Sequence, residues 1–429
     1  MESEHPRLDK TRHVKYWTRC LKTLLPHHYT GNESNRMYLA FFIISALDIL
    51  DAWDTVAKES ERQDYRNWIY HCQHPGGGFR MWPGTDFGDL ANDENAKWDP
   101  ANVPATYFAL SALTILGDDL QRVKRRETLD WLRDMQRPDG SFGETLVDGH
   151  IEGGRDPRFG YCATGARYIL RGLQEGPISI DGALVEDINV DALMRCIQAS
   201  ETYDGGIADE SFHEPHAGYT FCSLGCASFV DRVKMLGLPN QCSSRVPSDP
   251  ELTMRWLVSR QTDWLDPDAE LDGYQSGDAG DDLQTLKADD EDSRKVSTTQ
   301  LHQSPDKTTL LGPLTLDPPE AGMNGRPNKT ADTCYAWWVG ASLAMLGQPD
   351  LFCKARLRRY LLVSTQHAAL GGFGKFPGDL PDLYHSYLGL ASLGLIAHDD
   401  VKEVDATMCM SKEASGRLSA IWKRWNKPC

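Results

Sequence analysis

The chain has 429 residues, 40% of them hydrophobic, so it can bury a sizeable core in one large domain or in two or three smaller ones. Its formal net charge of −17 argues against nucleic-acid binding, because that function needs an excess of Lys and Arg to neutralise phosphates. The eleven cysteines lack the spacing of a disulfide framework, and the N-terminus lacks a signal peptide. The best apolar run, residues 37–47, is shorter than the ~20 residues of a membrane span. We therefore expect a cytoplasmic protein without an integral membrane segment.

An amphipathic helix that ends in Gln recurs along the chain, each time followed by a turn with Gly and an aromatic or aliphatic residue. The first four copies end 63, 62 and 63 residues apart, and a fifth ends 105 residues later. Helix pairs repeated at a fixed period cannot bury their apolar faces alone, so they must stack on their neighbours. The five copies end at Gln73, Gln136, Gln198, Gln261 and Gln366.

A second, more apolar helix with interspersed small residues completes each period. Two helices per period give about six pairs and predict an all-α protein. Such pairs either close into an α/α barrel (toroid), in which the loops at one end share a central cavity, or stack into an open solenoid, and the period alone does not decide between them. The second helices are predicted at residues 105–116, 160–172, 218–236, 333–346 and 383–396.

The longest interval between repeats contains an acidic insertion. Residues 263–295 hold twelve Asp and Glu against three Lys and Arg, and aromatic residues are nearly absent after Tyr274. A segment of this composition buries too little apolar surface to offset the entropy of ordering it. We therefore predict a single domain, residues 1–429, interrupted by a flexible loop at about 262–322. A regulatory or partner-binding role for the loop is the alternative to a merely solvated one.

Candidate metal ligands lie where two predicted second helices begin. A helix starting near Asp332 would present Asp332, Cys334 and Tyr335 at its mouth, although such an Asp is ordinarily an N-cap and such a Cys ordinarily core packing. His385 lies at the equivalent junction one repeat later, and in a closed ring these junctions face the same cavity. One Asp, one Cys and one His leave a coordination position open, which is typical of a catalytic zinc.

A basic group is expected at the same mouth. Arg326 and Lys329 precede Asp332, and His216 opens the second helix of another repeat. Charges beside a cavity lined with Trp, Tyr and Phe are costly unless they are neutralised, and helix N-termini help to bind an anion such as diphosphate. Because aromatic walls suit an apolar tail, these residues predict a ligand with an anionic head and a long apolar tail.

Three motifs resemble protein prenyltransferase β subunits in order and spacing: residues 216–222, residues 325–335 and residues 382–385. The resemblance covers residues 35–396 except the insertion. It implies an α/α barrel in an obligate heterodimer with a prenyltransferase α subunit, and one Zn²⁺ per β subunit.

The resemblance also implies a role for each matching position. Zinc would be held by Asp332, Cys334 and His385. The diphosphate would be held by His216, Arg326, Lys329 and Tyr335, with Tyr335 and Lys375 also taking part in catalysis. The isoprenoid would be contacted by Arg158, Tyr161, Cys222 and Trp338, with Tyr38 and Leu388 bearing on its length.

Within this family the chain most resembles geranylgeranyltransferase type I, in residues 36–50, residues 325–329 and Lys375. Farnesyltransferases carry an Asp, associated with magnesium, at the Lys375 position. Either cation offsets charge on the departing diphosphate, so Mg²⁺ should not be required here. Tyr38 and Tyr384 depart from the type I pattern. Leu388 is no larger than the aromatic residue found at its position in either class, so it could restore space for the lipid.

The resemblance thus implies the catalytic β subunit of a zinc-dependent enzyme that uses geranylgeranyl diphosphate. That enzyme joins the lipid by a thioether to the cysteine of C-terminal CaaX sequences, preferentially those ending in Leu, as in Rho/Rac-type small GTPases. A farnesyltransferase β subunit is the alternative. A terpene cyclase is a remote one, because residues 136–142 resemble cyclase repeats, but residues 289–292 do not form the required Asp-x-Asp-Asp motif.

Overall fold

The computed structural model describes residues 6–23, 25, 29, 34–174, 176–234, 246–263 and 320–426. These residues belong to one compact unit, formed by residues 1–264 and 320–429. The unit is mostly helical, and its short strands pair two by two. The strand pairs are β1 (Thr145–Val147) with β2 (His150–Glu152), β3 (Ile178–Ile180) with β4 (Ala183–Val185), β5 (Gln261–Thr262) with β6 (Gly322–Met323), and β7 (Val404–Asp405) with β8 (Met410–Ser411).

Six helix pairs make up the described part of the unit, each with an outer and an inner helix. The inner helices are α2 (Arg36–Ile49), α5 (Val103–Ile115), α7 (Pro157–Arg171), α9 (Ala217–Lys234), α11 (Thr333–Met345) and α13 (Leu383–Leu395). The outer helices are α1 (Lys10–Lys22), α4 (Glu59–His71), α6 (Arg125–Asp134), α8 (Val190–Ala199), α10 (Pro250–Val258) and α12 (Lys354–Arg359), the last continued by the π-helix η5 (Tyr360–Thr365). A short helix, α3 (Trp53–Val56), connects α2 to α4, and α14 (Lys412–Gly416) and α15 (Leu418–Trp425) end the described chain.

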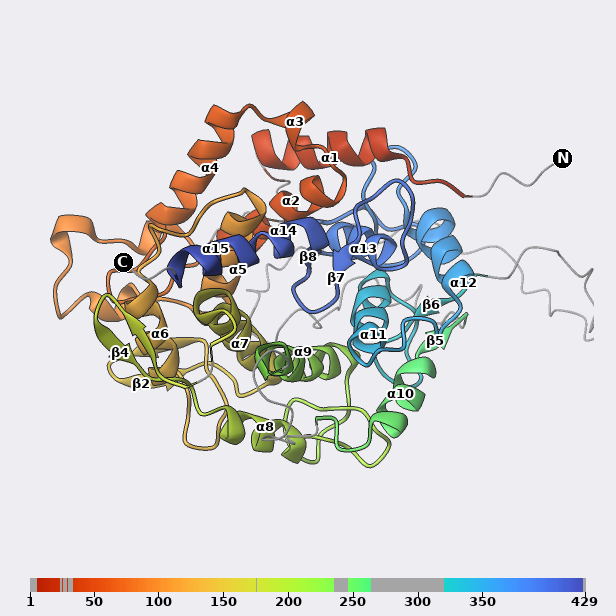
Figure 1. Ribbon diagram of the computed structural model, residues 1–429. Coiled ribbons are helices and arrows are strands. Elements are labelled where there is room, and N and C mark those ends of the chain that lie inside the picture. The colour runs from red at the N-terminus through yellow and green to blue at the C-terminus, as the bar shows by residue number, and fades with distance from the viewer. Residues whose placement is uncertain are drawn as a thin grey trace, which may run out of the picture. The chain divides into compact units, whose positions relative to one another are not determined.

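The inner helices form a closed ring. Each one packs against the next in chain order, and α13 packs against α2 (Figure 1). An open solenoid would leave the first and last inner helices without this contact. The structure is therefore an α/α toroid, which confirms the barrel and rules out the solenoid. The five inner helices that were predicted as second helices, α5, α7, α9, α11 and α13, also lie within three residues of their predicted bounds.

Composition explains why these helices line the ring. Four of them, α2, α5, α11 and α13, are apolar on nearly all sides, as expected of helices that are buried all round. Helix α7 is buried to the same extent but includes the buried Arg167 and Arg171. The small residues of the inner helices allow close approach between neighbours: a Cβ on Gly165 would lie 2.4 Å from the ring of Tyr107, and one on Gly225 would lie 2.5 Å from the ring of Tyr161. The interspersed glycines thus mark contacts between successive inner helices.

The recurring Gln joins one repeat to the next. In three copies its side-chain oxygen accepts a hydrogen bond from a backbone N–H just before the next outer helix, while its nitrogen donates to a carbonyl of the same segment. This satisfies backbone groups that a helix start leaves unpaired. The bonded pairs are Gln73 with Lys124 and Arg122, Gln136 with Asn189, and Gln261 with Cys353, at 2.7 to 3.0 Å.

Gln366 makes the same contacts with the start of the chain and so closes the outer layer. It accepts from the N–H of Asp9 at 3.0 Å and donates to the carbonyl of Arg7 at 3.2 Å. His13 of α1 adds to this junction, since its Nε2 lies 3.1 Å from Gln366 Oε1 and its Nδ1 accepts from the N–H of Gly372 at 3.3 Å. Helix α1, to which the sequence assigned no place, is therefore the outer partner of α2.

The His13 junction should make stability depend on pH. Burial lowers the pKa of His13 to about 4, and the bond to Gln366 and the charge of Asp9 only partly offset this effect. An unfolded chain takes up this proton near pH 6.5. Between pH 6.5 and 4 the unfolded state therefore binds more protons than the folded state, so the free energy of unfolding should fall by about 3 kcal/mol as the pH drops through this window.

Urea unfolding at pH 7, 6 and 5 tests this expectation. His13→Gln should lose its part of the pH dependence, whereas His150→Gln, which removes an exposed imidazole, should keep the wild-type slope. Equal slopes for wild type and His13→Gln would show that the His13 junction does not titrate as inferred.

A C-terminal hairpin, β7 with β8, lies inside the ring (Figure 1). The hydroxyl of Tyr107 donates to the carbonyl of Met408 at 2.8 Å, and that of Tyr161 donates to the carbonyl of Thr407 at 2.7 Å. Tyr387 bonds the carbonyl of Cys409 in the same way. Three inner helices thus hold the hairpin, which two-residue strands gave no sequence pattern to predict.

The ends of the acidic insertion are joined by the pairing of β5 with β6, in which Gln261 faces Met323 and Thr262 faces Gly322. The prediction of a flexible loop at 262–322 otherwise lies outside the described residues. None of the described helices is long and apolar enough to cross a membrane.

Candidate functional site

The three predicted metal ligands come together at the starts of α11 and α13. One ligand atom from each of Asp332, Cys334 and His385 lies within 4.8 Å of the other two, and His385 Nε2 is 3.3 Å from Asp332 Oδ1. Asp332 and Cys334 are buried, and His385 is nearly so. The adjacency of α11 and α13 in the ring therefore produces the convergence that the repeat register predicted.

Asp332 is both an N-cap and a candidate ligand. Its Oδ1 accepts from the N–H of Cys334 at 2.7 Å, which satisfies one of the unpaired donors at the start of α11. Its Oδ2 lies 4.0 Å from Nζ of Lys375. The interpretation of Asp332 as an N-cap is thus correct, and it does not exclude a role as a metal ligand.

Asp382 supports His385, a role that the sequence analysis missed. Its Oδ1 accepts from the backbone N–H of His385 at 2.8 Å, and its Oδ2 lies 2.6 Å from His385 Nδ1. This contact holds a proton on Nδ1 and leaves Nε2 directed at Asp332 and Cys334, as in carboxylate–histidine–metal arrangements. The signal available in the sequence was an Asp three residues before the candidate His at a helix start.

The protein's own charges prepare this cluster for a cation. Burial alone would lower the pKa of His385, but Asp332 and Asp382 outweigh it and hold that pKa well above its ordinary value. Burial would raise the pKa of Asp332, yet the charge and hydrogen bond of His385, together with the Cys334 side chain, keep that pKa below its usual range. Burial, together with Asp332, raises the pKa of the Cys334 thiol to about 12. Only a further positive charge would make this thiol a thiolate, which is the form that binds zinc.

The donor set fits zinc. A thiolate, an imidazole and a carboxylate are the ligands that zinc takes in proteins, and three of them leave a position open. The supporting Asp382 meets the usual requirement for a partner on the second imidazole nitrogen.

The loop that carries Lys375 is fixed to the start of α11, because Thr333 donates from its N–H to the Lys375 carbonyl at 3.1 Å and from its hydroxyl to the Gly374 carbonyl at 2.7 Å.

Replacing the supporting carboxylate should weaken metal binding more than it weakens the fold. Asp382→Asn keeps an oxygen to cap α13 but removes the charge beside His385 Nδ1, and loss of such a partner typically lowers metal affinity about 10- to 100-fold. Competition with a chromophoric chelator measures the affinity. Asp399→Asn, which removes an exposed carboxylate after α13, should leave it unchanged. Equal zinc affinities for Asp382→Asn and wild type would refute the supporting role.

Two of the predicted anion-binding residues meet beside the cluster. His216 Nε2 lies 2.9 Å from the hydroxyl oxygen of Tyr335, and His216 Nδ1 accepts from the N–H of Gly218 at 3.0 Å, which leaves Nε2 as the donor. Gly325 has to be glycine here, since a Cβ would lie 2.2 Å from the Tyr335 ring. The starts of α9 and α11 and the 325 loop therefore form one surface.

The two other predicted cations differ in their surroundings. Arg326 forms an ion pair with Glu214, with Nη1 to Oε2 at 3.2 Å. Lys329 is exposed, and its backbone carbonyl accepts from the side chain of Asn324 at 3.0 Å. Arg326 is thus held beside the start of α9, whereas the ammonium of Lys329 reaches into solvent.

Aromatic side chains run across the inner helices from Tyr38 to Tyr161. Tyr38 packs edge-on against Phe42 with ring centres 5.5 Å apart, and Phe42 contacts Tyr384. The indole N–H of Trp338 donates to the Tyr384 hydroxyl at 3.2 Å. Phe221, which was not predicted, links Trp338 to Tyr161 through ring contacts of 4.8 and 5.4 Å.

The remaining predicted lipid contacts lie on the same helices. Cys222 on α9 and Leu388 on α13 are buried. Arg158 at the start of α7 pairs with the N-cap Asp156 at 2.7 Å and lies over the ring of Tyr219. The sequence did not single out Phe42 and Phe221, which contact these residues, because an aromatic residue in an apolar helix does not stand out.

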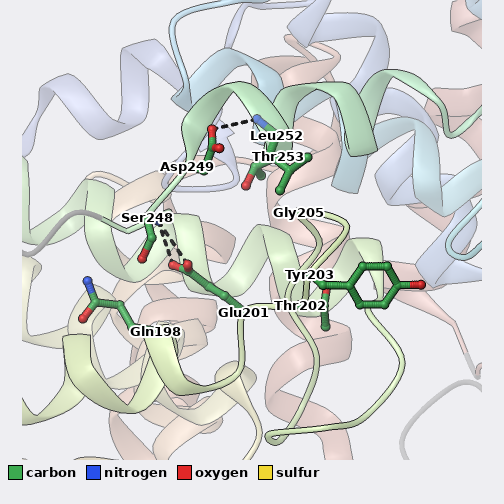
Figure 2. A pocket seen from close by; sticks show the side chains of 9 residues that line it. All are labelled: Gln198, Glu201, Thr202, Tyr203, Gly205, Ser248, Asp249, Leu252 and Thr253. Atoms are coloured by element: carbon green, nitrogen blue, oxygen red, sulfur yellow. Dashed lines mark hydrogen bonds between the residues drawn. The ribbon is translucent and has the colours of Figure 1, made fainter.

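A surface pocket of about 360 Å³ lies elsewhere, between the end of α8 and the start of α10 (Figure 2). Both of its carboxylates are engaged by backbone groups: Glu201 accepts from the N–H of Ser248, and Asp249 accepts from the N–H of Leu252. The pocket includes none of the predicted site residues.

Taken together, the closed ring of helix pairs and the cluster of Asp332, Cys334 and His385 at the starts of two inner helices define an α/α toroid with a candidate metal centre.

Comparisons with known proteins agree with this description. The family model described as the prenyltransferase alpha-alpha toroid domain matches residues 8–410. The geranylgeranyl transferase type-1 subunit beta of Arabidopsis thaliana is 30% identical over 398 residues, which cover 90% of this chain and 85% of that protein. The protein farnesyltransferase subunit beta of Schizosaccharomyces pombe is 25% identical over 412 residues, covering 93% and 81%.

A solved structure, Candida albicans protein geranylgeranyltransferase-I complexed with GGPP, has the same fold, with a TM-score of 0.71 and 24% identity over 97% of this chain and 99% of that one. The chain belongs to the prenyltransferase alpha-alpha toroid family, and it is a protein prenyltransferase β subunit. The resemblance to protein prenyltransferase β subunits that the sequence motifs indicated is thus confirmed.

Proposed function

We propose that the chain is the catalytic β subunit of a zinc-dependent protein geranylgeranyltransferase of type I. The observation that carries the proposal is a lysine, Lys375, whose Nζ lies 4.0 Å from Asp332 in the Asp332, Cys334 and His385 cluster. An ammonium at this place supplies fixed positive charge without a second metal. The higher identity to a type-1 subunit (30%) than to a farnesyltransferase subunit (25%) supports the same choice.

The proposed reaction forms a thioether between a substrate cysteine and C1 of geranylgeranyl diphosphate, and inorganic diphosphate leaves. When bound, zinc would lower the pKa of the substrate thiol so that it reacts as a thiolate. Arg326, Lys329 and Lys375 would offset the negative charge that grows on the departing diphosphate. The Nε2–H of His216 orients the Tyr335 hydroxyl at 2.9 Å, so that Tyr335 can donate to a diphosphate oxygen.

The aromatic residues of the inner helices would hold the isoprenoid. Trp338, Tyr384 and Tyr161 provide apolar ring faces, and burying the tail against them both binds it and excludes water from C1. Positioning the thiol and C1 together supplies the remaining rate advantage. The partners of this chain would be a prenyltransferase α subunit and CaaX C-termini ending preferentially in Leu.

One observation favours a farnesyltransferase β subunit instead. Tyr38 packs against Phe42 and lies near Phe108, so its ring takes up volume that a fourth isoprene unit would need. Tyr384, bonded to Trp338, similarly fills space beside His385. A shorter lipid would fit beside these rings with less rearrangement.

An assay of the complex with a co-expressed α subunit decides between the two. The type I proposal expects faster transfer from geranylgeranyl than from farnesyl diphosphate, to peptides ending in Leu, with no need for Mg²⁺. Faster farnesyl transfer to peptides ending in Ser or Met, with a requirement for Mg²⁺, would establish the alternative. No transfer from either diphosphate would refute both.

A further inference from the structure

Glu214, two residues before His216, has no role in the proposed chemistry, yet its carboxylate lies at the anion site. Its Oε2 is 3.2 Å from Nη1 of Arg326, which the proposed function assigns to the diphosphate. A carboxylate this close to an anion-binding guanidinium occupies a direction from which a phosphate oxygen would bind it. Glu214 and a diphosphate therefore compete for Arg326.

A second arginine, Arg260, is joined to the same loop by a backbone hydrogen bond and is influenced by the same carboxylate. Arg260 is buried, its Nη1 has no hydrogen-bond partner among the described residues, and its carbonyl accepts from the N–H of Asn324 at 2.9 Å. Burial lowers the pKa of Arg260, and the carboxylates of Asp204 and Glu214 partly offset the shift. Glu214 thus offsets positive charge on Arg326 by direct contact and on Arg260 from a longer distance.

The strength of the Glu214 contact suits a temporary partner. The Glu214 side chain is 55% exposed and that of Arg326 is 27% exposed, so solvent screens the pair and its net contribution is small. A diphosphate carries more charge than a carboxylate and offers several acceptor oxygens to one guanidinium. It should therefore displace Glu214 from Arg326, and the ion pair between Glu214 and Arg326 should form again when inorganic diphosphate leaves.

We propose that Glu214 is an internal counter-ion of the diphosphate site, a positioning residue that holds Arg326 in the empty enzyme and competes with diphosphate for it. This inference rests on the proposed function. It assigns Glu214 no contact with the reacting atoms, because it acts through Arg326. Because Glu214 competes for Arg326, the site should bind both the prenyl diphosphate and inorganic diphosphate less tightly than the cations alone would.

The test uses the complex with its α subunit at low ionic strength, with geranylgeranyl diphosphate and inorganic diphosphate as probes. Glu214→Gln keeps the size of the side chain and removes its charge, and it should lower both dissociation constants about five-fold, the upper end expected for one exposed ion pair. The gain should shrink as salt is added, because the pair is partly exposed. Glu210→Gln is the matched control, since it removes an exposed carboxylate from the same loop, and it should leave both constants nearly unchanged.

A double-mutant cycle separates competition through Arg326 from a general electrostatic effect. In an Arg326→Gln background, Glu214→Gln should no longer improve binding. Three results would each overturn the inference and leave the proposed function standing. The dissociation constants of wild type and Glu214→Gln could be equal, Glu210→Gln could tighten diphosphate binding as much as Glu214→Gln does, or Glu214→Gln could still tighten binding in the Arg326→Gln background. A wild-type complex that binds neither diphosphate would overturn the proposed function and this inference with it.

Discussion

Cys334→Ala is expected to remove the bound metal and to slow prenyl transfer about 10³-fold, since metal catalysis supplies several kcal/mol and each 1.36 kcal/mol is a factor of ten. The substitution leaves only the oxygen of Asp332 and the nitrogen of His385 as ligands from the cluster. Two neutral or singly charged donors hold zinc far less tightly than three that include a thiolate. The substrate thiol would then keep its ordinary pKa of about 8.5 and react largely in its protonated form.

Elemental analysis of the purified complex measures zinc content independently of activity. Cobalt substitution in the absence of peptide adds a thiolate-to-metal absorption band, which Cys334 supplies as the thiol of the cluster. Cys353→Ala is the matched control, because Cys353 is an exposed thiol on the same unit, and it should retain metal and activity. Circular dichroism should show that Cys334→Ala folds, as loss of one buried thiol leaves only a small cavity. A Cys334→Ala complex that kept one zinc per chain would refute the assigned ligand set.

The second large effect is expected at Lys375. Lys375→Ala should slow transfer about 10²-fold with zinc content unchanged, which is the usual cost of removing one preorganised group that stabilises transition-state charge. The loop should keep its place, because Thr333 bonds the carbonyls of Gly374 and Lys375 rather than the ammonium. The loss should therefore fall on the rate of transfer at saturating substrate.

Lys375→Asp distinguishes a charge effect from a structural one. A carboxylate at this position can bind Mg²⁺ together with diphosphate oxygens, so millimolar Mg²⁺ should restore part of the rate in Lys375→Asp and none in Lys375→Ala. Lys412→Ala, which removes an exposed ammonium on α14, should behave as wild type with and without Mg²⁺. Full activity of Lys375→Ala without Mg²⁺ would show that this ammonium does not assist the leaving group.

Cys334 and Lys375 differ in how much of their environment could be predicted from local sequence patterns. The bounds of α11 and α13, and the placing of Cys334 and His385 at their starts, followed from periodicity and from capping residues, which act within a few residues. The Asp332 cap was recognised for the same reason. Its contact with Lys375 was not, because that contact depends on how the turn before α13 folds back on α11.

Two other contacts of the site differ in whether such local patterns could have predicted them. The approach of Asp382 to His385 could have been inferred from the spacing alone, since both lie in one helix turn. The pairing of Glu214 with Arg326 could not, because these residues are 112 positions apart and belong to different repeats. Exposed acids are common in this acidic chain, so the identity of Glu214 carried no signal before its partner was known.

The sequence by itself determined the repeated helix pairs, the apolar inner helices and the junctions that carry the candidate metal ligands, because each depends on neighbours along the chain. Only the tertiary structure decided that the ring closes, with α13 against α2 and Gln366 bonded to the start of the chain. Closure depends on the small rotation between successive pairs summed over all of them, which the repeat period does not encode. The same summation brings the hairpin of β7 and β8 against inner helices from distant repeats. The pairing of Glu214 with Arg326 depends instead on the packing of the neighbouring helices α9 and α11, which the two residues precede.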